Sequence, residues 1–395
     1  MADTRPELPV LSYLLFPDIL SCILVAFGPP LWVRLLAFCA VCYTKLSGMH
    51  YYTADDATYD FTYGTVFLQQ ILAAAHYMLT TSPVDDVRHE HDVFKVSARE
   101  LPLLKRIYWT AGYCFGPRSV GWSDQVANVP ARPHISRWAF VRSHLLRIAW
   151  CLILVDIAQT YQHTHPDLFH RPTEALVSVG ADGYIMRCVN VLSTMSTVYA
   201  MINVHYSVCA IAAVGLGLSG PADWPNAFGR WADANTVRKF WGKTWHQMLR
   251  RSLSSPGRLI SRTLGFKRGT TASSYTQLYI AFILSGIQHS GGDYMADPTL
   301  WRQSFTANPL FYQSFTFFFS QAVAITGEDA VIWVGMKLGV RESRATRVLG
   351  YAWTFVWFSW SAANYADVCL NAKTGRGEVL PFSVSRYLGR NFGLL

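Results

Sequence analysis

The sequence predicts an all-α, polytopic integral membrane protein with about eight transmembrane helices, and three observations carry this prediction. Of the 395 residues, 51% are hydrophobic and only 15% are charged, whereas soluble domains carry about 25% charged residues. Aromatic residues reach 14%, with 14 Trp, and Trp favours the boundary between lipid and water. Apolar runs long enough to cross a bilayer as helices recur along the chain.

Each expected membrane helix corresponds to one apolar run. The charge-free stretch from Cys188 to Ala222 exceeds the ~20 residues of a single crossing, so we expect either one tilted helix or two elements there. Residues 330–340 are predicted to form a further interfacial or short membrane helix. The expected spans are 9–27, 31–46, 61–81, 139–160, 186–218, 275–291, 310–326 and 348–366.

Charge then predicts topology. Segments 85–138 and 223–274 are rich in Lys and Arg and should be cytosolic, whereas the acidic loop 47–60 should be lumenal. The chain therefore divides into N-terminal transmembrane helices (1–84), a basic cytosolic loop (85–138) and a membrane region (139–395) that includes loop 223–274. We expect a multi-pass protein of the endoplasmic reticulum, inserted by its first helix. Its net charge of +9 should face lipid or an anionic substrate, not nucleic acid.

Two histidines are the main candidates for chemistry. His289 lies in the charge-free run 269–292, and an ionisable group at membrane depth is costly enough to indicate function. His246 closes an aromatic, basic segment, 240–247. Imidazole titrates near neutral pH and can take a proton from an alcohol. A second polar group, such as Ser285 one turn before His289, can hold an acceptor or stabilise an oxyanion.

These segments resemble a known family. Phe240-Trp-Gly-Lys-Thr-Trp-His246-Gln247 and Ser285-Gly-Ile-Gln-His289 resemble the signature of wax-synthase-like membrane acyltransferases, relatives of the membrane-bound O-acyltransferase superfamily. Three further motifs resemble the fungal branch of this family, which acetylates terpenoids and meroterpenoids with acetyl-CoA. The resemblance covers roughly residues 115–365, and the three motifs are Gly116-Pro-Arg-Ser-Val-Gly-Trp122, Asn226-Ala-Phe-Gly229 and Gly327-Glu-Asp329.

The resemblance implies a helical bundle around a central cavity, with residues 139–395 as the catalytic membrane region. By this resemblance His289 is the general base and His246 the second active-site residue. His246 stands where sterol and diacylglycerol acyltransferases have Asn, and Ser290 follows His289 where they have Glu. Both departures point away from those branches. The implied reaction transfers an acetyl group to a hydroxyl of a hydrophobic, terpenoid-type metabolite.

The implied partners are acyl-CoA, a lipophilic alcohol and the lipid bilayer. The sequence does not indicate the oligomeric state. We expect acetyl-CoA as the co-substrate, with no metal and no permanently bound cofactor. The basic candidates would bind CoA phosphates, and their alternative is a solvated run that only sets topology. The candidate substrate- and CoA-binding residues are Trp241, Trp245, Gln247, Ser285, Arg238, Lys239 and Lys243, with Arg250 and Arg251 as further cations.

Other functions remain open from the sequence. The same chemistry would serve a long-chain wax-ester or sterol-ester synthase, and a transporter or scaffold would use the histidines as a proton relay or for packing. His163, His165 and His170 are better interpreted as polar loop residues than as the iron ligands of a desaturase-type enzyme. Asp156 and His205 could line the cavity or bond each other. We also expect Glu328-Asp329 to order loop 223–274 by pairing with its arginines.

Overall fold

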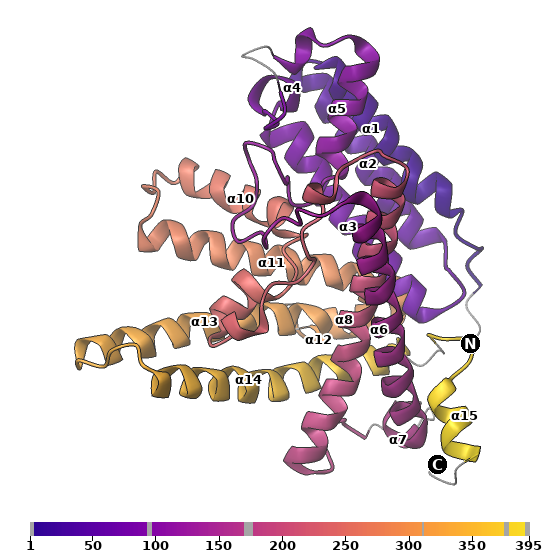
Figure 1. Cartoon of the computed structure of the whole chain (residues 1–395), viewed down its shortest axis with the longest axis vertical. Coiled ribbons are helices and arrows are strands. Elements are labelled where there is room, and N and C mark those ends of the chain that lie inside the picture. Colours follow the sequence, from indigo (N-terminus) through magenta and orange to yellow (C-terminus); the bar gives the residue numbers. More distant parts are fainter. Residues whose placement is uncertain (1–3, 93–96, 170–176, 310–311, 375–378, 392–395) are drawn as a thin grey trace. The chain divides into compact units, whose positions relative to one another are not determined.

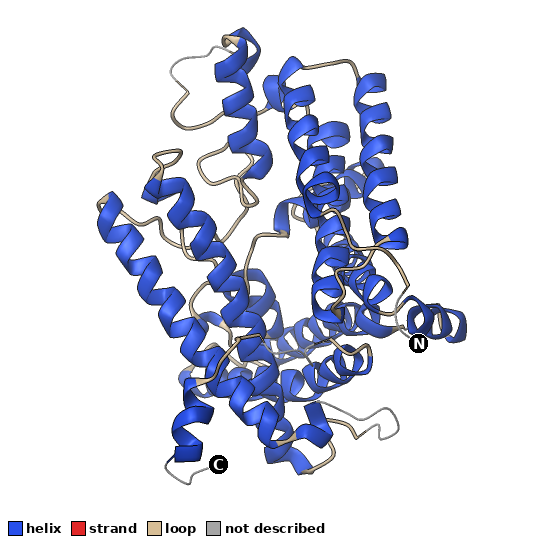
Figure 2. Cartoon of the chain, turned by 90° about the vertical axis from the view of Figure 1, so that its right-hand side faces the viewer, coloured by secondary structure: helices blue, strands red, loops and turns tan. Residues whose placement is uncertain are grey.

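The structure is a computed structural model that describes residues 4–92, 97–169, 177–309, 312–374 and 379–391. Helices make up the regular structure of these residues, and no β-strand occurs among them (Figure 2). Two isolated bridges, Glu7 with Thr53 and His89 with Trp122, are the exceptions to the helical pattern in the described ranges. The all-α fold class is therefore confirmed.

Every expected apolar span coincides with a helix (Figure 1). The π-helical turn Leu11–Leu15 leads directly into α1, and the π-helical turn His76–Thr80 extends α3. The eight helices are α1 (Phe16–Phe27), α2 (Leu31–Tyr51), α3 (Ala57–Ala75), α6 (Arg137–Thr164), α8 (Gly183–Gly215), α11 (Thr271–Ala296), α13 (Gln313–Lys337) and α14 (Arg344–Asn371).

Three of these helices, α2, α8 and α13, are long and apolar enough to cross a membrane, as judged over the described residues. The other five contain more polar residues or are shorter; α6, for example, carries Arg142 and Arg147. Apolar helices and long exposed apolar faces suit an integral membrane protein. The count of eight crossings stays a prediction.

The structure decides between two alternatives for one segment and corrects the expectation for another. Up to Gly215, the stretch from Cys188 to Ala222 belongs to a single helix, α8 of 33 residues, as the first of the two alternatives has it. It ends at Gly215, and Gly217 has a φ of 75° that favours glycine, so this glycine-rich segment terminates a helix. Most of 330–340 is the end of α13, which runs to Lys337, because its apolar residues continue the same helix without a break.

The two basic loops also contain helices. Segment 85–138 includes α5, and segment 223–274 includes α10, whose arginines make it strongly amphipathic. The remaining α-helices are α4 (Pro83–Asp86), α5 (Leu103–Phe115), α7 (Pro166–Phe169), α9 (Val237–Lys239), α10 (Arg250–Thr263), α12 (Pro298–Ala307) and α15 (Val384–Asn391).

The helices form two compact units, each built from segments that are distant in sequence. The first unit comprises Met1–Asn128 and Gln247–Gly327, and the second comprises Val129–His246 and Glu328–Leu395. Helix α13 contributes to both units, because it passes from Gly327 to Glu328 without interruption. The division of the chain at residues 84 and 138 concerns membrane topology and stays a prediction.

In the first unit, glycines let α3 and α11 approach at backbone distance. A Cβ added at Gly64 would collide with the carbonyl oxygen of Gly291, and one added at Gly292 would lie 2.6 Å from the carbonyl oxygen of Phe61. Small residues allow such close helix contacts. Helix α10 packs against α11 in the same way, because a Cβ at Gly257 would lie 3.0 Å from the Cα of Gln277.

A buried ion pair holds the N-terminal part of the first unit. The Lys45 side chain is fully buried, and its Nζ donates to Asp18 Oδ2 at 2.7 Å. The same Nζ donates to the carbonyl oxygens of Tyr13 (2.7 Å) and Leu14 (3.1 Å) in the π-helical turn. Removing either charge would leave its partner buried and uncompensated, which costs about 3–5 kcal/mol.

In the second unit, Asp156 has a structural partner. Its Oδ2 accepts hydrogen bonds from the backbone N–H and the hydroxyl of Ser385, near the start of α15. His205 is exposed, and its Nδ1 donates to the carbonyl oxygen of Met201. The alternative in which Asp156 and His205 bond each other is therefore wrong, because a helix N-terminus offers the carboxylate a better donor.

We predict that Gly64→Ala lowers the thermal stability of the protein in detergent, because its methyl group would push α3 away from the backbone of α11. Overpacking of this kind costs about 1–3 kcal/mol. Gly327→Ala is the matched control: Gly327 also lies within a helix, but nothing lies within 4 Å of an added Cβ, so it should be neutral or slightly stabilising. Equal melting midpoints for Gly64→Ala and the wild type would contradict the close approach.

Candidate active site

His289 is held in one tautomer by its own helix. Its Nδ1 lies 2.8 Å from the carbonyl oxygen of Ser285. A carbonyl oxygen only accepts, so Nδ1 must carry the hydrogen and Nε2 must carry the lone pair. His289 makes no other hydrogen bond within the described part of the chain. Nε2 is therefore the ring atom that can take a proton.

The orientation of the imidazole ring is fixed by α13. The half-buried ring stacks on Phe318, with centroids 4.0 Å apart and planes inclined by 27°. The contact between Ser285 and His289 comes from the Ser285 backbone carbonyl, and the predicted contact of the Ser285 side chain with substrate stays a proposal. Spacing of four residues on a helix explains the carbonyl contact, since residue i+4 lies over the carbonyl of residue i.

His246 lies in the second unit, where two sequence motifs pack on each other. Its ring lies 5.8 Å from that of Phe228, nearly perpendicular, and 5.6 Å from that of Trp245. Gly229 follows Phe228, and its N–H donates to the carbonyl oxygen of Thr244 at 2.9 Å. A Cβ at Gly229 would collide with the carbonyl oxygen of Lys243, which explains why this motif ends in glycine.

The predicted tryptophans belong to an aromatic cluster beside His246. Trp241 and Trp245 lie 6.1 Å apart, and Phe240 stacks on Trp245 at 5.6 Å. Phe358 of α14 closes the cluster, 4.2 Å from Phe240. His246 therefore packs among aromatic rings in the second unit. The predicted contact of Trp241 and Trp245 with substrate stays a proposal.

The acidic pair Glu328-Asp329 anchors the segment that leads to His246. Glu328 is buried and accepts from the backbone N–H of Val237 (2.7 Å), the N–H of Arg238 (3.1 Å) and Nε1 of Trp353 (2.9 Å). Asp329 forms a two-pronged ion pair with the Arg238 guanidinium. The expected ordering of this loop is confirmed, although Glu328 binds backbone N–H groups and not an arginine.

The remaining candidates have separate environments. Arg238 is engaged with Asp329, so its guanidinium has a structural task besides any contact with CoA. Lys239 Nζ donates to Asn235 Oδ1 at 3.1 Å, and the Lys243 side chain is exposed. Gln247 is buried and its Oε1 accepts from Arg250 at 2.8 Å.

The structure brings some of the candidates together and leaves others in separate units. Arg238, Lys239, Trp241, Lys243, Trp245 and His246 lie on one segment of the second unit, whereas Gln247, Ser285 and His289 lie in the first. No cluster of three or more His, Cys, Asp or Glu side chains suited to a metal is found where the chain is described. His170 lies outside the described residues.

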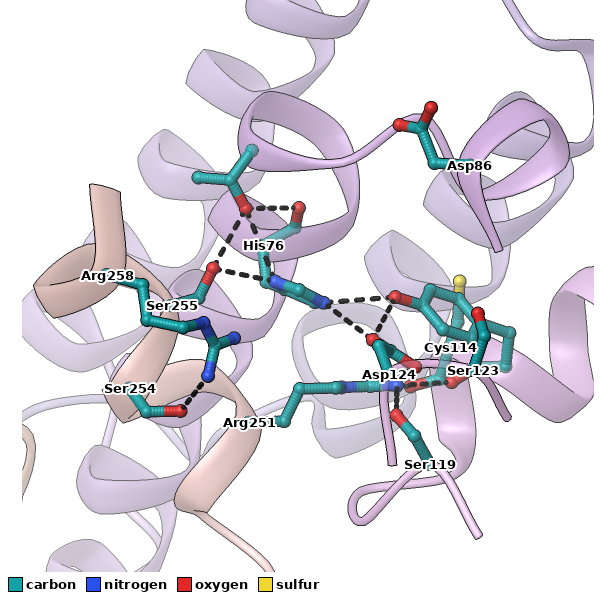
Figure 3. Close-up of polar contacts among 12 residues, drawn as sticks. His76, Asp86, Cys114, Ser119, Ser123, Asp124, Arg251, Ser254, Ser255 and Arg258 are labelled. Carbon is teal, nitrogen blue, oxygen red and sulfur yellow. Dashed lines mark hydrogen bonds and ion pairs between the residues drawn. The ribbon is translucent and has the colours of Figure 1, made fainter. Parts of the chain in front are cut away.

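A buried polar network in the first unit escaped the sequence analysis (Figure 3). His76 Nδ1 lies 2.9 Å from Ser255 Oγ, and His76 Nε2 lies 3.0 Å from the Tyr113 hydroxyl. The Tyr113 hydroxyl donates to Asp124 Oδ2 at 2.8 Å, which is itself 3.4 Å from His76 Nε2. The network joins α5 and α10 to the turn after α3.

Arg251 of α10 extends this network and clamps a sequence motif (Figure 3). Its NH1 donates to the Tyr113 carbonyl oxygen (3.0 Å) and to Ser119 Oγ (2.8 Å), and its NH2 donates to the Cys114 carbonyl oxygen (3.3 Å). Ser119 lies inside the Gly116–Trp122 motif. Arg251 is only 4% exposed, so it acts as a structural clamp and the prediction of a surface cation for CoA phosphates does not fit it.

Charge compensation keeps Asp124 ionised. Burial alone would raise the pKa of the Asp124 carboxyl, but hydrogen bonds with His76 and Tyr113 and the nearby Arg251 charge outweigh burial, so this pKa lies below its ordinary value. Burial is the main cause that raises the pKa of the Tyr113 hydroxyl, which therefore stays protonated and donates. Arg251 thus ties the motif loop to α10, and Asp124, just after the motif, is tied to Tyr113 of α5 and to His76.

A cavity of about 160 Å³ lies beside Arg251 in the first unit, with room for about five water-sized groups. Gln70 Nε2 donates to the carbonyl oxygen of Leu14, while its buried Oε1 has no partner among the described residues. The wall residues are Asp18, Gln69, Gln70, Ala73, Tyr77, Cys114, Phe115, Pro117, Arg251 and Ser252.

Helix α3, which forms part of the cavity wall, packs against α11, which carries His289, in the same unit. The Leu68 side chain packs on Gly291, two residues after His289, and Gln69 and Gln70 follow Leu68 directly. A helix rises about 1.5 Å per residue. Measured along the helix axes, Gln70 therefore lies within about one helical turn of His289.

Comparison with known proteins adds independent information. Residues 224–320, which include both His246 and His289, match the Membrane bound O-acyl transferase family, and residues 136–215 match the Aspirochlorine biosynthesis protein F C-terminal domain. No solved structure matches the chain significantly.

Curated relatives match over most of the chain. Acetyltransferase ple2 from Rhodocybe pseudopiperita is 33% identical over 386 residues, which cover 96% of this chain and 93% of that protein. Acetyltransferase eriL from Hericium erinaceus is 30% identical over 74% of each chain. O-Mevalon transferase macI from Penicillium terrestre is 29% identical, over 68% of this chain and 64% of its own length.

We predict that Asp124→Asn lowers thermal stability at pH 7, by on the order of 1–2 kcal/mol, because it weakens hydrogen bonds made to a charged group. A carboxyl whose pKa is depressed in the folded state stabilises the protein above its unfolded pKa, and this contribution is lost as the pH falls through the folded pKa. The gap between variant and wild type should therefore narrow below about pH 4.

Thermal unfolding in detergent micelles between pH 3 and 7 measures this gap. Asp55→Asn is the control, because Asp55 is exposed in a loop where its φ of 62° suits Asn, and it should match the wild type throughout. A gap that is absent at pH 7, or constant with pH, would contradict the ionised role of Asp124.

Proposed function

The chain belongs to the membrane bound O-acyl transferase family, and from this premise we propose that it transfers an acetyl group from acetyl-CoA to a hydroxyl group of a hydrophobic, terpenoid-type secondary metabolite. The protein is an acyltransferase, since curated relatives matched over most of its length are acetyltransferases. The family also argues against a transporter, a scaffold or a desaturase-type enzyme. Location in the endoplasmic reticulum, with many membrane passes, is part of the proposal.

The donor is proposed to be acetyl-CoA because ple2 and eriL are named acetyltransferases. The relative macI, named an O-mevalon transferase, provides a specific reason to test a second short acyl group, one that carries its own hydroxyl. Long-chain donors for wax or sterol esters remain the alternative with the same chemistry. The chain length of the acyl group distinguishes these cases.

The observation that carries the mechanism is the tautomer of His289. With Nδ1–H donated to the Ser285 carbonyl oxygen, Nε2 is ready to accept the proton of the acceptor hydroxyl. The alcohol oxygen then bonds to the thioester carbonyl carbon, giving a tetrahedral oxyanion. The C–S bond breaks as the carbonyl re-forms, the proton passes from His289 to the thiolate, and ester and CoA-SH leave.

His246 is proposed as the second active-site residue, with its imidazole stabilising the oxyanion or holding the acceptor. Holding both reactants in one dry cavity would supply much of the rate advantage. The exposed Lys243 and its neighbour Lys239 are the proposed contacts for CoA phosphates. Arg238 is proposed to act mainly by holding this segment against Asp329.

The acceptor is proposed to place a polar substituent in the cavity beside Arg251. Its wall combines apolar side chains such as Ala73 and Phe115 with the polar side chains of Gln69 and Gln70. A hydroxyl on an otherwise apolar skeleton matches that combination. The proposal therefore concerns acceptors with at least two oxygen functions.

We predict that His289→Ala abolishes ester formation from acetyl-CoA, with a loss of about 10²–10⁴-fold, the usual contribution of a general base. The assay uses microsomes at matched protein level, labelled acetyl-CoA, and a pool of terpenoid, sterol and fatty alcohols. His205→Ala is the matched control, because His205 makes the same Nδ1 bond to a carbonyl one turn earlier but lies exposed on α8.

The outcomes of this assay separate the functions. Ester from labelled palmitoyl-CoA alone would move the assignment to wax or sterol esters. Full activity in His289→Ala, or equal loss in both histidine variants, would contradict the base mechanism.

We predict that Gln70→Leu raises the KM for a hydroxylated terpenoid acceptor by about 10-fold or more, because a ligand hydroxyl would lose its acceptor. The KM for acetyl-CoA should change less than about two-fold, since the donor does not contact this wall. Steady-state kinetics with each substrate varied in turn measures the split. Thr62→Val, on an exposed face of α3, should change neither KM, and a shift in the acetyl-CoA KM alone would refute the assignment.

A further inference from the structure

Asp293 is a buried carboxylate whose side-chain hydrogen bonds, among the described residues, all come from one residue. It is 1% exposed and lies four residues after His289 on α11. Its Oδ2 accepts from the backbone N–H of Ser314 at 3.0 Å, and its Oδ1 accepts from the Ser314 hydroxyl at 2.8 Å. Both oxygens of the carboxylate are thus committed to one residue of the neighbouring helix.

Ser314 lies at the start of α13, where the Asp293 side chain finds two hydrogen-bond donors. The first N–H groups of a helix lack intrahelical partners, and the helix dipole favours a negative charge at that end. Ser314 is completely buried, so neither its N–H nor its hydroxyl can turn to water instead. Asp293 therefore caps α13 from a different helix.

The same two helices also meet at His289. Phe318, which stacks on the His289 ring at 4.0 Å, lies four residues after Ser314 on α13. Residues four apart lie on one helix face, about one turn from each other. The pair Asp293–Ser314 and the pair His289–Phe318 are therefore successive contacts between α11 and α13, one turn apart on each helix.

Little slack is left between these helices. A Cβ added at Gly286 would lie 2.8 Å from the Phe315 ring and 3.2 Å from the Phe315 Cα. Ser290, which follows His289, accepts a hydrogen bond from Nε1 of Trp301 at 2.7 Å, which also ties α11 to α12. A change in the axial register of α11 against α13 would thus move the aromatic face on which the imidazole rests.

We propose that Asp293 and Ser314 form a positioning pair that sets the register of α11 against α13 and thereby directs Nε2 of His289 at the reacting hydroxyl. The inference rests on the proposed role of His289 as general base. Neither residue touches the imidazole, so each acts through Phe318 and the helix backbone. Asp293 lies just beyond the charge-free run 269–292. Hydropathy alone therefore assigns it to the end of a membrane helix.

Orientation matters because a base works only within hydrogen-bond reach of the proton it takes. Displacement of a reacting group by about 1 Å can cost on the order of 10²-fold in rate. Loss of the pair should therefore lower kcat while substrate affinity is retained, since neither residue is proposed to bind acetyl-CoA or the acceptor.

The test compares Asp293→Ala, Ser314→Ala, Ser314→Thr and the double alanine variant with wild type, in microsomes with labelled acetyl-CoA and the pooled alcohols. Asp293→Ala should lower kcat by about 10²-fold, with the acetyl-CoA KM within about three-fold. Ser314→Ala keeps the backbone bond and should lose less, and Ser314→Thr keeps the hydroxyl and should restore activity. The double variant should be no worse than Asp293→Ala, because the two residues act as one unit.

Additive losses, or a wild-type kcat in Asp293→Ala, would overturn the proposal, as would a loss confined to KM. If Asp293→Ala fails to accumulate, the two Ser314 variants carry the test, and equal activity of Ser314→Ala and wild type would overturn it.

A second readout needs no substrate and so separates this proposal from the proposed function. Diethyl pyrocarbonate acylates accessible imidazole nitrogens, and mass spectrometry can resolve His289 from the exposed His205. Asp293→Ala should change the modification rate of His289 by about three-fold or more and leave that of His205 unchanged. If wild type forms no ester but this rate shifts, the function fails and the positioning pair stands; an unchanged rate overturns the pair.

Discussion

Backbone-to-backbone contact at glycine is the constraint on which both histidine segments depend. In the first unit, Gly64 of α3 meets Gly291 of α11 two residues after His289, at a distance that leaves no space for a Cβ. In the second unit, Gly229 meets the backbone of Lys243 three residues before His246. Direct packing of main chains fixes a segment more closely than side-chain contact does, because no rotamer can adjust. The two histidines therefore lie on segments whose positions within their units are fixed by main-chain contacts.

Compensated charge is the second organising principle. In surroundings of low polarity an uncompensated ion is expensive, and the charges buried in each unit have close partners. Lys45 is matched by Asp18, Arg251 donates to three acceptors around Tyr113, and Glu328 receives three N–H groups. Each of these ties elements that are far apart in sequence. Several charged residues that composition alone would assign to membrane topology or to CoA binding therefore stabilise the fold instead.

The sequence was sufficient to locate the helices, but it could not show which residues contact the two candidate histidines. Each expected apolar run located a helix because hydropathy is a local property. Helix spacing also placed Ser285 one turn from His289, but only the coordinates show that the carbonyl, not the hydroxyl, makes the bond. The pairing of Asp293 with Ser314 and the clamp of Arg251 on Ser119 join residues whose spacing follows no period. The sequence offered two partners for Arg238, a CoA phosphate and the acidic pair Glu328-Asp329. Composition alone could not decide between them.

The central claim is that His289 acts through Nε2 because Ser285 occupies Nδ1. A crystal structure of the wild type with CoA and an unreacted alcohol acceptor, a complex that cannot turn over, tests it most directly. The account predicts Nε2 of His289 within about 2.6–3.2 Å of the acceptor hydroxyl, with the bond from Nδ1 to the Ser285 carbonyl oxygen preserved. An acceptor bound away from His289, or an imidazole turned so that Nδ1 faces the hydroxyl, would contradict it.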